Sequence, residues 1–194
     1  LTVDQRFRAY CEAHGLSILR QLQIGTDGPA RCSSVFLVLD TDGLVKIFKE
    51  LKPPTFEQSK DPIAWEDEMC EHLGNLSALP RYYGLVEIDE ALSFMRFGVC
   101  YGQSLADYIT LGNLLARDEA CLVVNRIAQA LAQLHACNVA YLDVRPENIK
   151  LDGSEIHLLD VGDARLLEHP AAEVATHVHD PRYTPPETKL RGVA

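Results

Sequence analysis

The sequence has few of the features that mark nucleic-acid-binding or membrane-spanning chains. Its 194 residues include only 18 lysines and arginines against 28 aspartates and glutamates, which gives a net charge of −10. This acidic balance disfavours general binding to nucleic acid or to anionic membranes. Apolar runs such as Val35 to Leu39 are too short for a transmembrane helix. We therefore expect neither nucleic-acid binding nor membrane insertion.

The sequence also lacks the marks of a secreted protein. None of its six cysteines forms a CxxC pair, and their spacing does not suggest a disulfide framework. Charged residues precede any apolar stretch at the N-terminus, so we do not expect a secretory signal there. We expect reduced thiols in a cytoplasmic protein. Because the first residue is leucine, we also expect a processed or cut piece of a longer chain.

Apolar residues make up 47% of the chain, enough for a core in one domain or two small lobes. Apolar spacing predicts a helix over 3–14 and another over 64–76, the second ended by Pro80. Residues 16–49 predict a three-stranded antiparallel meander whose last strand ends at Phe48. Further strands are expected at 83–88, 91–97, 149–151 and 156–159, with a long apolar helical stripe from Ala120 to Leu134 and a loop-like tail from 168 to 194.

A group of acidic and amide side chains follows the long helix. Residues 141–148 have the sequence Tyr-Leu-Asp-Val-Arg-Pro-Glu-Asn, and Asp160 comes twelve residues after Asn148, behind an apolar strand. This spacing brings Asp143, Asn148 and Asp160 around one small space. Carboxylate and amide oxygens suit Mg²⁺, and a carboxylate that escapes the metal can accept a proton from an attacking hydroxyl.

This stretch resembles the catalytic loop and metal-binding motif of the protein kinase family. Residues 28–35 lie where that family has its glycine-rich loop, and residues 183–187 resemble its Ala-Pro-Glu segment. Lys46 resembles the strand lysine that holds the α- and β-phosphates of ATP, and Glu66 resembles the helix glutamate that pairs with it. Together the motifs extend the resemblance over residues 16–187.

Two other carboxylates compete with Glu66 for that position. Glu68 and Glu71 lie on the same expected helix, so the spacing from the lysine does not separate them from Glu66. Helical phase favours Glu66, because it shares a face with apolar residues three, four and seven positions later. We therefore expect Glu66 to form the pair.

The resemblance implies an α+β, two-lobed kinase-like fold of the bacterial serine/threonine type. Its expected parts are an N-terminal helix (1–15), an N-lobe with an antiparallel sheet and one helix (16–98), and a partial helical C-lobe (99–194) with the catalytic loop and activation segment. The C-lobe is expected to be truncated, and a partner chain could complete it. The hinge is expected at 98–102.

The function implied is an ATP- and Mg²⁺-dependent protein kinase that phosphorylates a serine or threonine of a protein substrate. The implied site residues are Asp143, Arg145, Lys46 and Glu66 for catalysis; Gly28, Ala30, Ser33, Val35, Lys46, Met95 and Phe97 for the nucleotide; and Asn148 and Asp160 for the metal. Arg145 stands where a lysine is common, near the γ-phosphate.

Several positions depart from the family pattern. Alanine and serine occupy two glycine positions of the phosphate loop, which makes close backbone approach harder. Tyr141-Leu142 replaces the usual His-Arg before the catalytic aspartate, and Val161 replaces the usual phenylalanine. These departures leave two alternatives open: a pseudokinase acting as a nucleotide-binding or scaffolding module, and a kinase of a small metabolite.

Overall fold

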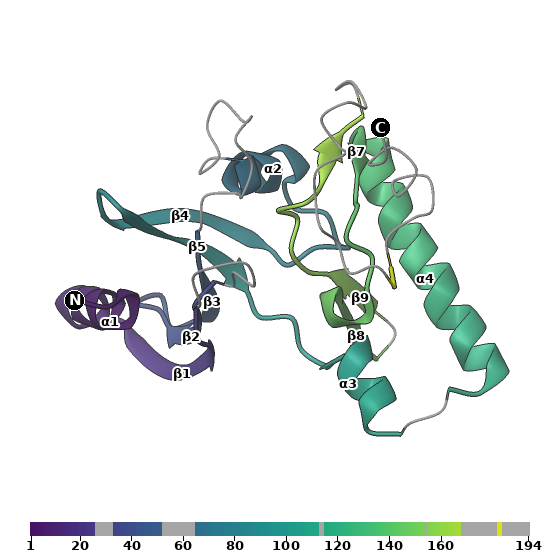
Figure 1. Ribbon diagram of the computed structural model, residues 1–194, viewed down its shortest axis with the longest axis horizontal. Helices are drawn as coiled ribbons and strands as arrows, with labels where there is room; N and C mark the ends of the chain where they lie inside the picture. The colour runs from purple at the N-terminus through teal and green to yellow at the C-terminus, as the bar shows by residue number, and fades with distance from the viewer. Residues whose placement is uncertain (26–32, 52–64, 113–114, 154, 168–181, 184–194) are drawn as a thin grey trace. The chain divides into compact units, whose positions relative to one another are not determined.

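The computed structural model describes residues 1–25, 33–51, 65–112, 115–153, 155–167 and 182–183 (Figure 1). The chain divides into two compact units, the first of residues 1–74 and 81–99, the second of residues 75–80 and 100–194. The first unit contains α1 (Val3–Ala13), β1 (Ser17–Gln23), β2 (Val35–Leu39), β3 (Val45–Glu50), α2 (Trp65–Leu73), β4 (Tyr82–Asp89) and β5 (Leu92–Gly98). The second contains β6 (Gln103–Ser104), α3 (Leu105–Thr110), α4 (Arg117–Ala136), β7 (Val139–Ala140), the 3₁₀ turn η1 (Pro146–Asn148), β8 (Ile149–Asp152), β9 (Glu155–Leu158) and β10 (Arg165–Leu166).

The first unit is built on a five-stranded antiparallel sheet in the order β1-β2-β3-β5-β4. The predicted meander over 16–49 is confirmed as β1 to β3. Strand β3, however, runs on to Glu50 instead of ending at Phe48. One of these two additional residues is Lys49, and it is this lysine that faces α2.

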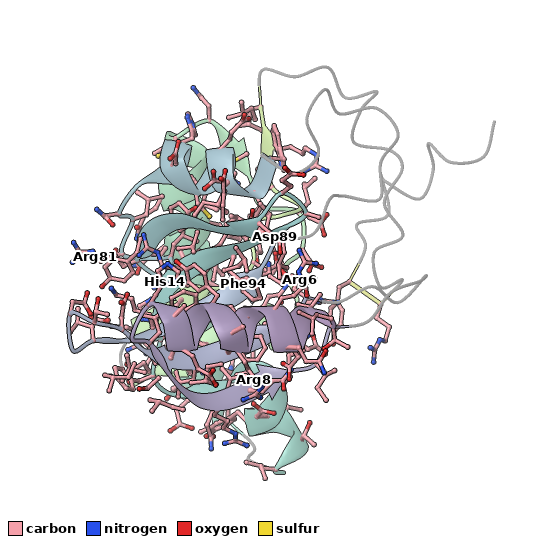
Figure 2. The ribbon with its side chains drawn as sticks, turned by 90° about the vertical axis from the view of Figure 1, so that its left-hand side faces the viewer. Arg6, Arg8, His14, Arg81, Asp89 and Phe94 are labelled. Atoms are coloured by element: carbon pink, nitrogen blue, oxygen red, sulfur yellow. The ribbon has the colours of Figure 1, made fainter. Side chains whose placement is uncertain are left out.

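Helix α1 covers one face of this sheet (Figure 2). The Phe7 side chain is fully buried, and its ring centroid lies 4.2 Å from that of Phe94 and 4.6 Å from that of Phe36. A capping box between Thr2 and Gln5 starts the helix by satisfying free N–H groups of its first turn. The predicted helix over 3–14 is therefore confirmed, and it contributes directly to the aromatic core.

Helix α2 is shorter than the sequence predicts. It ends at Leu73 because Gly74 adopts a φ of 58°, the left-handed conformation that terminates helices. The expected end at Pro80 is therefore wrong. Residues 75–80 belong to the second unit, where the Ala78 carbonyl accepts a hydrogen bond from the Leu158 N–H at 2.8 Å. The buried residues of α2 are Met69, Cys70 and Leu73.

The second unit joins the long helix α4 to a three-stranded sheet, β6-β8-β9, and to a β7–β10 ladder. The strands expected at 149–151 and 156–159 are confirmed as β8 and β9. The apolar stripe of α4 is only half buried: Ala130 and Leu134 are inside, whereas 66% of Val124 is exposed. None of the helices in the described ranges combines the length and apolar content needed to cross a bilayer.

Candidate active site

Strand β3 presents its two lysines to opposite faces of the sheet. Phe48 belongs to the aromatic cluster under α1, so Lys46, two residues earlier, lies on that same face. Lys46 Nζ donates to Asp40 Oδ2 at 2.7 Å and to Asp42, and only 6% of its side chain is exposed. Burial alone would lower the pKa of Lys46, but the hydrogen bonds to these carboxylates outweigh it and raise the pKa. The ammonium group of Lys46 is thus bound by carboxylates of the turn that joins β2 and β3.

The lysine that faces α2 is Lys49. Its Nζ lies 2.6 Å from Glu66 Oε1, and both side chains are largely buried. The expected pairing of Lys46 with Glu66 is therefore wrong, because side chains alternate along a strand and positions 46 and 49 point in opposite directions. The helical phase of Glu66 was predicted correctly, since its rivals Glu68 and Glu71 are exposed. The burial of Phe48 under α1 places Lys46 on the face away from α2, and the sequence alone does not show which face α1 covers.

The face of the sheet that carries Lys49 also carries several expected nucleotide contacts. Across the strands, Lys49 pairs with Val35 on β2 and with Met95 on β5. Phe97 lies on the same face, because it pairs with Ile47. Of the remaining expected contacts, Ser33 lies two residues before the start of β2. Gly28 and Ala30 fall outside the described residues.

A buried carboxylate, missed by sequence reasoning, joins the ends of the segment that contains the expected phosphate loop. Glu50 Oε2 accepts a hydrogen bond from the Ser34 N–H at 2.8 Å, and Ser34 Oγ accepts one from the Gly25 N–H at 3.2 Å. A Cβ atom on Gly25 would lie 2.5 Å from Ser34 Oγ and 2.9 Å from Glu50 Oε2. Glycine is therefore required at position 25 for this close approach.

In the second unit, the turn η1 places Asn148 against Asp143. The Asn148 side-chain Nδ2 donates to Asp143 Oδ2 at 2.6 Å and to the Asp143 backbone carbonyl at 3.2 Å. Arg145 Nε lies 3.2 Å from Asp143 Oδ2. Only 14% of the Asp143 side chain is exposed. The carboxylate is therefore held in one orientation by neighbours within five residues of it.

Burial is the main influence on the ionisation of Asp143. It raises the pKa of this carboxyl, and the nearby carboxylates of Asp163 and Asp160 act in the same direction. Arg145 and the hydrogen bond from Asn148 oppose the change without cancelling it, so the pKa stays above its ordinary value. A carboxylate with a raised pKa accepts a proton more readily than a fully solvated one.

Strands β8 and β9 are antiparallel, so the end of β9 that precedes Asp160 lies beside the start of β8, which follows Asn148. Ile149 pairs with Leu158, and the Leu159 N–H donates to the Asn148 carbonyl at 2.8 Å. Tyr141, which replaces the family histidine, is buried and donates its hydroxyl to the Leu159 carbonyl. Asp160 itself has a φ of 64°, and its Oδ1 accepts a hydrogen bond from the Gly162 N–H at 3.2 Å. Hydrogen bonds that involve the backbone thus hold the segment that leads into Asp160 in place.

The donor set around Asn148 suits a small hard cation. Because the Asn148 amide nitrogen is engaged with Asp143, the amide oxygen is the atom turned away from that carboxylate. The Asp160 carboxylate is exposed, and Asp160 follows Leu159, whose N–H donates to the Asn148 carbonyl. One carboxylate and one amide oxygen match the short protein ligand lists of Mg²⁺ sites, in which phosphates and water supply the other ligands.

A lysine–glutamate pair on an antiparallel sheet and an Asp–Asn loop in a helical unit are features that protein kinases use in phosphoryl transfer. The chain belongs to the protein kinase family: the protein kinase domain matches residues 23–191. Its fold is accordingly that of an α+β kinase, with an antiparallel N-lobe sheet and helices that follow it. Helix α1 lies before the matched residues.

Several curated relatives are kinases. Human serine/threonine-protein kinase Nek2 is 27% identical over 179 residues, which cover 87% of this chain and 40% of that kinase. The human phosphorylase b kinase gamma catalytic chain, liver/testis isoform, is 29% identical over 142 residues, which cover 72% of this chain and 34% of the relative. The chain therefore spans less than half the length of these relatives.

Proposed function

We propose that the protein is an ATP- and Mg²⁺-dependent kinase that transfers the γ-phosphate to a serine or threonine hydroxyl of a protein substrate. The observation that carries this proposal is the Asp143 carboxylate, which is largely buried and is oriented by Asn148 and Arg145. Membership of the protein kinase family supports the reaction type, and the similarity to serine/threonine-protein kinase Nek2 supports serine/threonine specificity.

Each unit has its own part in this reaction. In the first, Lys49 binds the α- and β-phosphates of ATP while Glu66 orients its ammonium group. In the second, Asn148 and Asp160 would hold Mg²⁺, which would offset charge on the phosphates. Asp143 accepts the proton of the acceptor hydroxyl as its oxygen bonds to the γ-phosphorus. The bond between that phosphorus and the β–γ bridging oxygen breaks, and ADP leaves with the bonding electrons.

Mg²⁺-dependent stabilisation by ATP tests the binding half of the proposal. ATP at about 100 times its Kd stabilises a folded protein by about 2.7 kcal/mol, which is roughly 5–10 °C in melting temperature for a chain of this size. We expect this shift in a thermal melt with ATP and Mg²⁺ and a much smaller one with ATP and EDTA. The Asp160→Asn variant should lose the difference between the two conditions. An equal shift of the wild-type protein with and without EDTA would contradict the metal assignment.

Replacing Asp143 tests the catalytic half. Asp143→Asn keeps the size of the side chain and one oxygen acceptor but removes the base, so transfer should fall about 100-fold. The thermal shift with Mg²⁺ and ATP should stay close to that of the wild type. Transfer is measured with radiolabelled ATP and dephosphorylated casein as a generic acceptor. Equal rates for the two proteins would exclude Asp143 as the base.

A further inference from the structure

Two consecutive residues of helix α2 make polar contacts with the sheet. Glu66 accepts a hydrogen bond from Lys49 on β3, and Asp67 accepts one from the Tyr82 hydroxyl on β4. Strand β5 lies between β3 and β4, so the two contacts lie on either side of it. Consecutive helical residues point about 100° apart. The two contacts therefore restrict rotation of α2 about its own axis as well as its distance from the sheet.

Apolar packing of α2 does not restrict that rotation in the same way. The buried residues of the helix are Met69, Cys70 and Leu73, and apolar packing has little directional preference. A hydrogen bond, in contrast, weakens steeply when its angle changes. The bond from Tyr82 to Asp67 is thus a polar contact that can keep α2 in register while Glu66 holds Lys49.

Tyr82 is suited to this task because it is itself held in place. Its ring centroid lies 5.3 Å from that of Phe97, the residue opposite it on β5. Burial raises the pKa of Tyr82, and the hydrogen bond to Asp67 acts in the same direction, so the hydroxyl keeps its proton and stays a donor. Phe97 in turn lies on the face that carries Lys49.

We propose that Tyr82 and Asp67 are positioning residues that act on Lys49 through Glu66. This inference rests on the proposed kinase function, in which Lys49 binds the phosphates of ATP. Without the bond from Tyr82, α2 rotates away from the orientation that directs Glu66 at Lys49. The lysine is still present, but its ammonium group is aimed less well at the arriving phosphates.

A double-mutant cycle tests this role. Tyr82→Phe removes only the hydroxyl, and we expect kcat/KM for ATP to fall about tenfold, with the same loss in Asp67→Ala. Asp67→Asn should recover most of the activity, because its amide oxygen accepts the same hydrogen bond. In a Glu66→Ala background, adding Tyr82→Phe should cost less than about twofold, because the group that it positions is already absent.

The adjacent residue in the chain provides a matched control. The Tyr83 ring lies 4.8 Å from Lys46 Nζ, on the other face of the sheet from Lys49, so Tyr83→Phe should behave as the wild type. A full tenfold loss on adding Tyr82→Phe to Glu66→Ala would show a merely structural role and overturn the proposal. Wild-type activity in Tyr82→Phe would also overturn it.

A second measurement separates this inference from the proposed function. Amide hydrogen exchange over residues 65–73 needs no nucleotide, and it should be faster in Tyr82→Phe than in the wild type or Tyr83→Phe. If the wild type transfers no phosphate, the proposed function fails, and faster exchange still supports the anchoring of α2 by Tyr82. Unchanged exchange overturns the anchoring whatever the activity.

Discussion

Lys49→Met is expected to lower phosphoryl transfer about 1,000-fold, the loss seen when a positioned charge at a phosphate or oxyanion is removed. Lys49 is the β3 lysine that Glu66 contacts, at 2.6 Å. Methionine keeps most of the length of the side chain but has no charge to place on the α- and β-phosphates. Both side chains are largely buried, so removing the ammonium group from beside Glu66 should also lower the free energy of unfolding by about 1–3 kcal/mol. Transfer from radiolabelled ATP and a thermal melt provide the two measurements.

The matched control is Lys46→Met, on the opposite face of the same strand. It leaves Asp40 and Asp42 without their shared cation, and Asp40 is nearly buried. The free energy of unfolding should therefore fall by about 1–3 kcal/mol, while the folded protein keeps most of its transfer rate. The reverse pattern, with Lys46→Met inactive and Lys49→Met active, would mean that the strand lysine had been assigned to the wrong position.

Phe7→Ala is expected to lower the free energy of unfolding of the first unit by about 3–5 kcal/mol. The Phe7 ring is fully buried and contacts Phe36, Phe48 and Phe94, so alanine would leave a cavity between α1 and the sheet. Arg6 and Asp89 form an ion pair beside this aromatic cluster (Figure 2). The pair is too exposed to offset the loss of stability. Urea unfolding followed by circular dichroism measures the change.

Val124→Ala is the matched control for this loss. Val124 is 66% exposed on α4, so its truncation should change the free energy of unfolding by less than about 0.5 kcal/mol. Equal midpoints for Phe7→Ala and Val124→Ala would show that α1 does not belong to the folded core. The full effect would show that the core includes an element that precedes residues 23–191, the part that matches the kinase domain.

Much of the fold could be predicted from local sequence patterns. Apolar spacing located α1 and most strands, because the periods of helices and strands are set within a few residues. The aspartates and asparagine near β8 and β9 were found because their partners are close in sequence: Asn148 bonds to Asp143, five residues before it. Helical phase identified Glu66 over Glu68 for the same reason.

The sequence by itself therefore determined the kinase-like order of elements and the loop that carries Asp143 and Asn148, because these depend on short-range spacing. Only the tertiary structure decided which lysine meets Glu66. Lys46 and Lys49 share a strand, and the choice between them depends on which face α1 covers, through contacts between Phe7 and strands far along the chain. The same holds for Tyr82 and Asp67, and for Gly25, Ser34 and Glu50. Their hydrogen bonds join elements whose proximity arises from sheet order and side-chain packing, which no local period encodes.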